Sequence, residues 1–284
     1  MFKEPDVFSV LQTAKYFLKS KGLLEYKFDA EALLSFLLQI KCSKLPFLYN
    51  QILSIEQLRQ FERYILRRSK REPVAYITGY TGFMGFEFKV NKKVLIPRPE
   101  TELLVEAVLK MAKKQTELKI LDLCTGSGCI AISLAKIGEF KTITAIDIDK
   151  FALKVAKENA KINDIESINF IKSNLFTNLE ENKFDIIISN PPYVSDEEYA
   201  FLEKDLMYEP KHALVAKKDG LFFYTEIAKN AKKFFNNNGH IFLELNSNKV
   251  NQIKQLFVGN NFEDIEIIKD YSGLSRILKA KILI

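Results

Sequence analysis

Four consecutive residues, Asn190-Pro191-Pro192-Tyr193, carry the groups needed to hold a planar nitrogen without protonating it. The Asn190 side-chain carbonyl and the Pro191 backbone carbonyl can accept the two hydrogens of an NH2 group. The same two oxygens stabilise the positive charge that develops on the nitrogen as it reacts. Tyr193 can stack on the planar group and exclude water. The pattern therefore indicates methyl transfer to an amide or exocyclic amine nitrogen.

A simple turn is the alternative interpretation of these residues, because paired prolines end a strand and Asn favours turns. Their position favours a functional role, since they directly follow a strand-like apolar run, 184–189, downstream of a glycine-rich loop. The residues of that loop are Asp122, Cys124, Thr125, Gly126, Ser127 and Gly128.

The loop predicts a nucleotide-containing cofactor, because a strand, a glycine turn and a helix N-terminus bring backbone N–H groups to a ligand. Asp147 ends the next strand, where its carboxylate can accept both ribose hydroxyls of an adenosine. Helix capping is the alternative role, and Asp149 is better placed for it. Asp122 either orients the cofactor or braces the loop. NAD and S-adenosylmethionine share these features, and the residues at 190–193 favour the latter.

General-base and metal chemistry have little support in the sequence. His212 and His240 are the only histidines, and no Ser-His-Asp or Cys-His pattern is evident. Cys42, Cys124 and Cys129 form neither a disulfide framework nor a C-x-x-C pair, so we expect reduced thiols and no metal site. An activated methyl donor needs alignment more than a base.

The elements that must position these residues alternate between strand and helix from residue 102 onward. We expect strands over 119–123, 142–146, 169–173, 184–189, 240–245, 265–268 and 276–283, and helices over 102–113, 127–137, 150–162, 221–235 and 249–258. This alternation predicts a doubly wound parallel sheet with ligands at the carboxyl ends of its strands. The last two strands are separated by only a short turn, so they should pair antiparallel.

The N-terminal part has a different pattern, with apolar residues at helical spacing up to Lys70 and a capping box formed by Ser54 and Gln57. Alternating apolar residues then indicate a β-hairpin. We therefore divide the chain into a helical substrate-docking domain (1–72), a β-hairpin linker (73–98) and a catalytic domain (99–284).

Composition limits the classes of partner. The 284 residues include 42 Lys+Arg and 36 Asp+Glu, a formal charge of +6. The basic residues are mostly lysine and are spread along the chain, which indicates a solvated surface and no stable nucleic-acid binding. The first ten residues lack the apolar stretch of a signal peptide, and no apolar run approaches the ~18 residues of a membrane span. We expect a cytoplasmic protein without membrane association.

With these motifs, the chain resembles the HemK/PrmC family, the peptide chain release factor glutamine N5-methyltransferases, over nearly its whole length. The family signature is present as Gly85-Phe86-Glu87-Phe88 and as the run 94–102. The resemblance implies a class I S-adenosylmethionine-dependent methyltransferase fold: a Rossmann-like seven-stranded sheet, last strand antiparallel, with a small N-terminal helical domain. Arg98, Thr101 and Glu102 belong to this signature, although they could equally serve to fix the hairpin to the following helix.

The family methylates the side-chain amide (N5) of the glutamine in the Gly-Gly-Gln (GGQ) loop of class 1 release factors, converting S-adenosyl-L-methionine to S-adenosyl-L-homocysteine. The resemblance therefore implies release factors 1 and 2 as partners. Carried over by position, the catalytic residues are Asn190, Pro191 and Tyr193, and Pro192 joins them in binding substrate. The cofactor residues are Asp122, Cys124, Thr125, Gly126, Ser127, Gly128, Asp147, Asn174, Leu175 and Asn190. Relatives often carry an acid at 174 and some an aromatic at 175, so we expect adenine to be bound more weakly or to be packed differently here.

Three competing functions use similar motifs. An adenine-N6 DNA methyltransferase holds a flipped base with the same tetrapeptide, but such enzymes need a recognition domain, and the residues after Tyr193 suffice only to finish the sheet. A ribosomal-protein glutamine methyltransferase would have the same core, and the run 97–102 and the helical domain favour release factors. A non-catalytic S-adenosylmethionine-binding module would not need Asn190.

Overall fold

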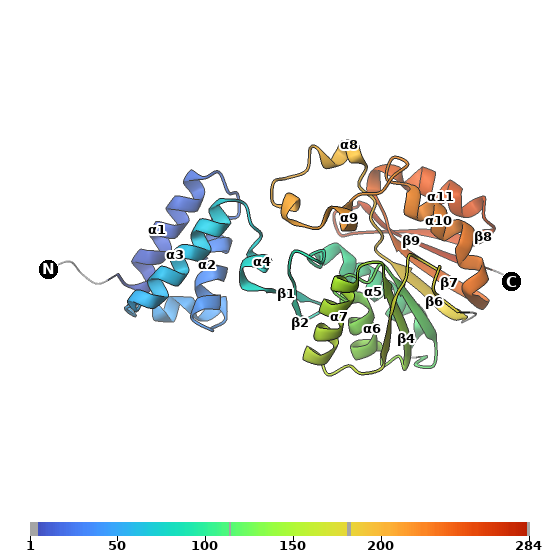
Figure 1. Cartoon of the computed structure of the whole chain (residues 1–284), viewed down its shortest axis with the longest axis horizontal. Helices are drawn as coiled ribbons and strands as arrows, with labels where there is room; N and C mark the ends of the chain where they lie inside the picture. Colours follow the sequence, from blue (N-terminus) through green and yellow to red (C-terminus); the bar gives the residue numbers. More distant parts are fainter. Residues whose placement is uncertain (1–4, 114, 181–182, 283–284) are drawn as a thin grey trace. The chain divides into compact units, whose positions relative to one another are not determined.

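The computed structural model describes residues 5–113, 115–180 and 183–282, which form parts of two compact units (Figure 1). One unit comprises residues 1–79 and 203–208, and the other comprises 80–202 and 209–284. Within the described ranges, no helix combines the length and the apolar character needed to cross a bilayer.

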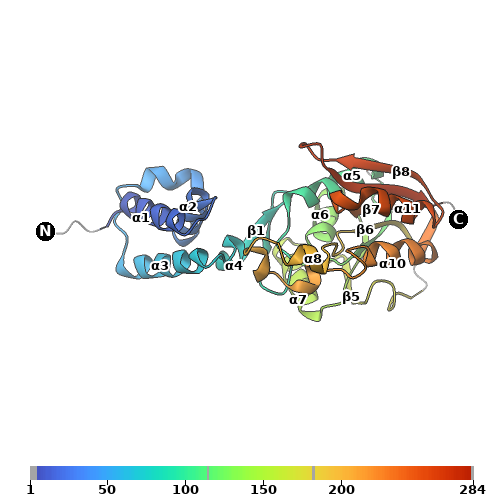
Figure 2. The same ribbon diagram turned by 90° about the horizontal axis from the view of Figure 1, so that it is seen from above.

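The first unit is helical. It contains α1 (Val7–Ser20), α2 (Tyr26–Leu37), the 3-10 helix η1 (Cys42–Leu48), α3 (Ile55–Ser69), α4 (Val74–Thr78) and the 3-10 turn η2 (Leu206–Tyr208). Helices α1, α2 and α3 pack against one another (Figure 2) and bury Leu11, Leu33 and Phe61. Ser54 and Gln57 form the expected capping box at the start of α3, so the helical pattern in this part of the sequence is confirmed.

The start of the expected hairpin linker needs a correction. Residues 74–78 form the short helix α4 and are not extended. Pro73 can precede a helix because its fixed φ suits the helix entry, and Gly79 ends α4 in the left-handed conformation, at φ 85°. The antiparallel hairpin itself is formed by β1 (Tyr80–Phe83) and β2 (Phe86–Lys89).

A distant segment, 203–208, completes the helical unit. The buried Arg68 donates from Nε to Asp29 Oδ2 at 2.7 Å, and its Nη1 lies 2.8 Å from Asp205 Oδ2. Burial raises the pKa of Asp29, and the Arg68 guanidinium opposes that rise. Tyr208 adds a hydrogen bond from its hydroxyl to the Lys70 carbonyl oxygen at 2.8 Å. A buried arginine between two carboxylates thus ties this segment to α2 and α3.

The second unit is a three-layer α/β/α structure around a seven-stranded sheet of order β5-β4-β3-β6-β7-β9-β8 (Figure 1). The strands are β3 (Lys119–Leu123), β4 (Thr142–Asp147), β5 (Ile168–Lys172), β6 (Phe184–Ser189), β7 (Phe235–Glu244), β8 (Phe262–Lys269) and β9 (Ser275–Ile282). The helices are α5 (Pro99–Ala112), α6 (Cys129–Gly138), α7 (Lys150–Ile162), α8 (Asp196–Tyr199), α9 (Lys211–Leu214), α10 (Phe222–Asn230) and α11 (Val250–Val258), with 3-10 turns η3 (Ala231–Phe234) and η4 (Ser247–Lys249).

Two apolar clusters hold the layers together. Helices α5, α6 and α7 cover one face of the sheet, where Leu104 and Ile132 are buried. Helices α10 and α11 cover the other face with Ile227 and Phe257. Strands covered on both faces carry continuous apolar runs, and the run at 186–188 is fully buried.

The predicted class I methyltransferase fold is confirmed. Strands β3 to β7 are parallel, and β9, the last strand in the chain, is antiparallel to both of its neighbours, β7 and β8. One boundary differs from expectation, because the helix predicted to reach residue 235 ends as α10 at Asn230. After η3, β7 begins at Phe235, which pairs with Phe184. At Phe235, backbone hydrogen bonding with β6 therefore takes precedence over the helical spacing of the apolar residues.

Candidate active site

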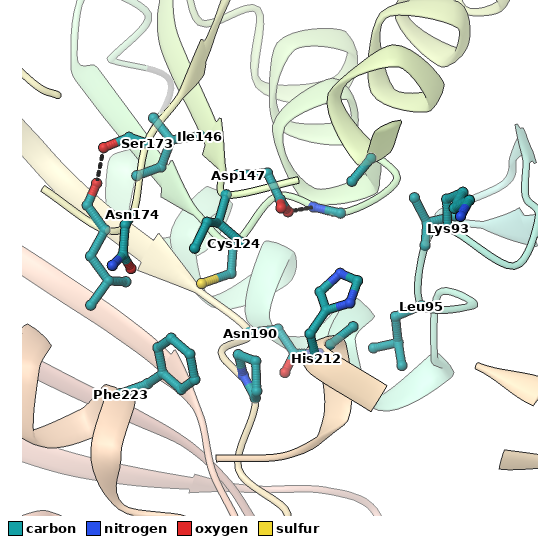
Figure 3. A pocket seen from close by; sticks show the side chains of 17 residues that line it. Lys93, Leu95, Cys124, Ile146, Asp147, Ser173, Asn174, Asn190, His212 and Phe223 are labelled. Atoms are coloured by element: carbon teal, nitrogen blue, oxygen red, sulfur yellow. Dashed lines mark hydrogen bonds between the residues drawn. The ribbon is translucent and has the colours of Figure 1, made fainter. Parts of the chain in front are cut away.

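A pocket opens in the second unit at the carboxyl ends of β3, β4, β5 and β6 (Figure 3). The strand register explains its location, since Leu123 pairs with both Ile146 and Ser189. The residues that follow these three positions must therefore emerge side by side at one edge of the sheet. Of the residues singled out from the sequence, the pocket is lined by Cys124, Gly126, Asp147, Asn174, Leu175, Asn190 and Pro192.

The loop after β3 turns sharply. Cys124, Gly126 and Gly128 have φ of 62°, 54° and 82°, in the left-handed region that favours glycine. The Thr125 N–H donates to the Ile146 carbonyl at 2.9 Å, which anchors the loop to β4. Gly128 has a packing role, because a Cβ there would lie 3.1 Å from the Cβ of Ala156 on α7. The absence of a side chain at 128 lets α6 begin close against α7.

Asp147 lines the pocket, and each oxygen of its carboxylate already accepts one hydrogen bond from a backbone N–H group. Its Oδ2 accepts from the Gly126 N–H and its Oδ1 from the Asp149 N–H, both at 2.9 Å. Burial raises the pKa of Asp147, and these two N–H groups oppose the rise. Asp149 accepts from the Phe151 N–H and caps α7, as the sequence indicated. Each Asp147 oxygen keeps a lone pair for a ligand, and its ribose contact stays a prediction.

Asp122 is fully buried, and its two oxygens differ. Oδ2 accepts from the Thr125 hydroxyl at 2.6 Å, so Asp122 braces the loop. Oδ1 makes no hydrogen bond of normal geometry with any residue in the described ranges. Burial raises the pKa of Asp122 to about 7, opposed by the Thr125 hydroxyl and the Ala131 amide. An unpaired buried oxygen is costly and marks a position where a ligand or water can bind. The loop residues Thr125, Ser127 and Gly128 are buried and do not line the pocket, and neither does Asp122.

Asn190 reaches the pocket from the end of β6, and its amide has a defined partner on α5. Its Nδ2 donates to Thr101 Oγ1 at 3.1 Å. The Thr101 hydroxyl in turn donates to Glu244 Oε2 at 2.6 Å. Tyr193 donates from its hydroxyl to the other oxygen, Glu244 Oε1, at 3.3 Å. A buried carboxylate at the end of β7 is thus linked by hydroxyl groups to two residues of the tetrapeptide.

Burial raises the pKa of Glu244 to about 7, and the hydroxyls of Thr101 and Tyr193 oppose the rise. Burial and the neighbouring Glu244 carboxylate also raise the pKa of Tyr193. Tyr193 does not line the pocket, and it packs against the apolar cluster on the α10 and α11 side of the sheet. Pro191 is buried outside the pocket lining as well. The proposed stacking of Tyr193 on a substrate stays a prediction.

The other two signature residues brace the scaffold. Arg98 forms an ion pair with the buried Glu209, whose Oε2 also accepts from the Ile96 N–H at 3.1 Å. Glu102 Oε1 accepts from the Met84 N–H at 2.6 Å, which fixes the hairpin to α5. Thr101, by contrast, contacts a predicted site residue directly, through its hydrogen bond with Asn190.

Several pocket residues were not anticipated from the sequence. His212 on α9, Phe223 on α10 and Leu95 line the pocket (Figure 3), and Ile148 lines it as well. His212 Nε2 lies 3.7 Å from Asp149 Oδ2. His212 lies on the four-residue helix α9, and Leu95 and Ile148 lie on irregular segments. Phe223 is on α10, where periodicity indicates which face is buried but not which side chain meets a ligand.

Comparison with known proteins places these features in a family. The family model "Methyltransferase small domain" matches residues 99–224, and "PrmC N-terminal domain" matches 9–79. The release factor glutamine methyltransferase of Fusobacterium nucleatum is 37% identical over 283 residues, which cover 99% of this chain and 80% of that protein. The release factor glutamine methyltransferase of Buchnera aphidicola is 40% identical over 253 residues, which cover 88% of this chain and 90% of that protein.

Solved structures agree on the fold. A 16S rRNA N2 G1207 methyltransferase from T. thermophilus, in complex with AdoMet and guanosine, aligns with a TM-score of 0.52 at 19% identity. The alignment covers 72% of this chain and 49% of that one. At this identity the likeness extends to the fold alone.

Proposed function

Since the chain belongs to the release factor glutamine methyltransferase family, we propose that it methylates the side-chain amide nitrogen (N5) of the glutamine in the GGQ loop of class 1 release factors. S-adenosyl-L-methionine is the proposed donor, and S-adenosyl-L-homocysteine the product. Release factors 1 and 2 are the proposed partners, and a translation substrate implies a cytoplasmic reaction.

One observation carries the proposal: Asn190 lines the same pocket as Asp147 and the loop residues Cys124 and Gly126. A donor bound by the loop and an amide bound at Asn190 would therefore share one cavity. Proximity of two reactants in a fixed orientation is the main source of acceleration for such a transfer. An adenine-N6 DNA methyltransferase or a ribosomal-protein glutamine methyltransferase could use the same arrangement, and it is the similarity to release factor glutamine methyltransferases that favours a release factor as substrate.

The residues present fit S-adenosylmethionine. Asp122 is the proposed partner of the ammonium group of the methionine moiety, because its Oδ1 has no hydrogen bond of normal geometry among the described residues, although Asp122 does not itself line the pocket. Asp147 offers free lone pairs to ribose hydroxyls, and Asn174 and Leu175 lie in the pocket lining for adenine. The bound donor supplies an electrophilic methyl group on a sulfonium.

The acceptor residues would then align the glutamine amide. With Nδ2 of Asn190 held by Thr101, Asn190 Oδ1 is the end that can accept one hydrogen of the substrate NH2. The Pro191 carbonyl can accept the second. Both hydrogens held in this way leave the nitrogen lone pair free to face the methyl group, and both oxygens stabilise the charge that grows on nitrogen. The C–S bond breaks as the C–N bond forms, and one of the two hydrogens then leaves the nitrogen as a proton. The histidine in the pocket, His212, has no assigned part in proton transfer.

We assign the docking of the release factor to the helical unit. An apolar groove between α1 and α3, lined by Phe17, Leu58 and Leu66 among others, supports this role. A protein partner fits such a surface better than nucleic acid does, because nucleic acid is bound chiefly through clustered positive charge.

Incubation with methyl-labelled S-adenosylmethionine tests the proposal. The substrates compared are a purified release factor, its GGQ variant with Gln→Ala, and duplex DNA. We expect label on the unaltered release factor alone, and mass spectrometry should place it on the glutamine. Label on the Gln→Ala variant or on DNA would contradict the proposal.

A further inference from the structure

The Asn190 side chain can bind a substrate NH2 group only if its oxygen, and not its nitrogen, faces the pocket. The oxygen accepts hydrogens, whereas the amide nitrogen would meet the substrate's NH2 group donor to donor. The two ends have nearly the same shape, so packing alone does not choose between them. Hydrogen bonding must therefore fix the choice.

We propose that Glu244 and Thr101 are positioning residues that fix the direction of the Asn190 amide, so that its oxygen faces the acceptor glutamine. The inference rests on the proposed function. Neither residue lines the pocket, so both act through Asn190.

The direction follows from counting hydrogens along the chain of hydrogen bonds. An ionised carboxylate can only accept, so the Thr101 hydroxyl must give its single hydrogen to Glu244, 2.6 Å away. Thr101 Oγ1 then has only lone pairs to offer to Asn190. The Asn190 atom that lies 3.1 Å from Thr101 Oγ1 must therefore be the donor, Nδ2. Asn190 Oδ1 is left as the outward-facing end.

Protonation of Glu244 removes this constraint. A neutral carboxyl group can donate to Thr101, whose hydroxyl hydrogen can then point to Asn190 and favour the oxygen there. The Asn190 amide nitrogen would then face the substrate. Burial raises the pKa of Glu244 to about 7. Near neutral pH, the series of hydrogen bonds can therefore run in either direction.

The surroundings of Glu244 come from several elements. Thr101 and Glu100 belong to α5, Arg276 to β9, and Tyr193 follows β6. The Glu100 carboxylate raises the pKa of Glu244, and the Arg276 guanidinium lowers it, both less than burial does. Further groups near it are Tyr224 on α10, whose hydroxyl donates to the Glu244 backbone carbonyl at 2.8 Å, and the buried Cys129 thiol on α6.

A purely structural role would not require a carboxylate. Among the described residues, the two side-chain hydrogen-bond partners of Glu244 are hydroxyl groups, and both donate to it. Burying a charge without a hydrogen-bonded cation is unfavourable, and the uncharged amide of a glutamine could form hydrogen bonds with both hydroxyl groups in its place. The carboxylate differs from this amide because it can only accept hydrogen bonds. This property sets the direction of the hydrogen bonds from Asn190 through Thr101 to Glu244.

The first test compares Thr101→Val with Thr101→Ser. The Val variant keeps the shape but removes the hydroxyl. We expect kcat for release factor methylation to fall roughly 10- to 100-fold, the scale for groups that orient a ligating side chain. The Kd of S-adenosylmethionine by calorimetry should change less than about 2-fold, because Asp147 and the loop are untouched. The Ser variant should restore most of kcat.

A matched control is Thr225→Val on α10. It removes another threonine hydroxyl, which donates to the Leu221 carbonyl at 2.8 Å and lies outside the pocket lining. This variant should keep wild-type kcat. Thermal melts of all three variants show whether any loss reflects unfolding.

The second test is the pH profile of kcat at saturating S-adenosylmethionine for the wild type and Glu244→Gln. Wild-type kcat should fall as the pH drops through the pKa of Glu244, which is about 7. The Gln side chain neither titrates nor enforces one direction, so kcat of this variant should be lower, by roughly 10-fold, and its acid limb should be weaker than that of the wild type. Asp122 is present in both proteins, so the difference between the profiles isolates Glu244.

The outcomes separate the two proposals. If the wild type labels the release factor but Thr101→Val keeps wild-type kcat, or if the acid limb of Glu244→Gln is the same as that of the wild type, the inference is wrong and the proposed function stands. If the wild type binds S-adenosylmethionine but does not label the glutamine, both are wrong. A loss of kcat in Thr101→Val that Ser restores, with cofactor affinity preserved, supports the inference.

Discussion

Replacing Asp122 with Asn should make the free energy of unfolding less dependent on pH, so that the variant gains stability relative to the wild type as the pH rises. In the folded state, burial raises the pKa of Asp122 from 3.8 to about 7. The unfolded chain releases its proton near the lower value, so between the two values the folded state binds more protons than the unfolded state. Stability therefore declines as pH rises through this window.

The magnitude follows from the shift. Each pH unit within the window costs about 1.4 kcal/mol. The difference in unfolding free energy between the Asn variant and the wild type should therefore increase by about 2 kcal/mol, in favour of the variant, from about pH 5.5 to about pH 8. Asn keeps an oxygen that can accept from Thr125, so the bond that braces the loop survives.

Urea unfolding of both proteins at the two pH values, without cofactor, measures this difference. A constant offset between wild type and Asp122→Asn would refute the reasoning, because it would mean that Asp122 titrates as it does in the unfolded chain. The same variant should bind S-adenosylmethionine more weakly by calorimetry, since the neutral amide loses the charge offered to the ammonium group. Equal affinity would remove Asp122 from the cofactor site.

Further substitutions test other parts of the structure. Asn190→Ala should raise the barrier to methyl transfer by about 2.7 to 4 kcal/mol, by analogy with the loss of one oxyanion donor, with little change in cofactor affinity. Single-turnover rates near wild type would exclude its role. Asp147→Ala should weaken S-adenosylmethionine binding in calorimetry, and an unchanged Kd would overturn the ribose assignment. Arg68→Ala leaves the buried Asp29 without its cation, while Asp205 keeps Arg71 at 4.0 Å, so urea unfolding should show a loss of about 3 to 5 kcal/mol, and a loss below about 1 kcal/mol would contradict the account of this cluster. Leu66→Glu, in a half-exposed part of the groove, should raise KM for whole release factor but not for a short GGQ peptide, and equal effects on both would exclude the docking role.

The sequence indicated the fold through signals that are local in the chain. Apolar runs bounded by turns located the strands, and hydroxyl or carboxylate caps located helix starts at Ser54 and Asp149. Parallel strands alternating with helices place the residues after each strand at one edge of the sheet. For this reason the order of strands and helices along the chain was sufficient to predict Asn190 and Asp147 in one pocket.

Tertiary structure alone decided which partners these residues have. Asn190 and Thr101 are 89 positions apart, and Thr101 and Glu244 are 143 apart. The segment 203–208 joins the helical unit through Arg68, and no periodic pattern marks it. Such contacts depend on how helices and strands pack in three dimensions, whereas periodicity reports only which face of an element is buried. The chain alone therefore indicated the chemistry of the site, while the packing of α5 against the end of β7 set the direction of its key amide.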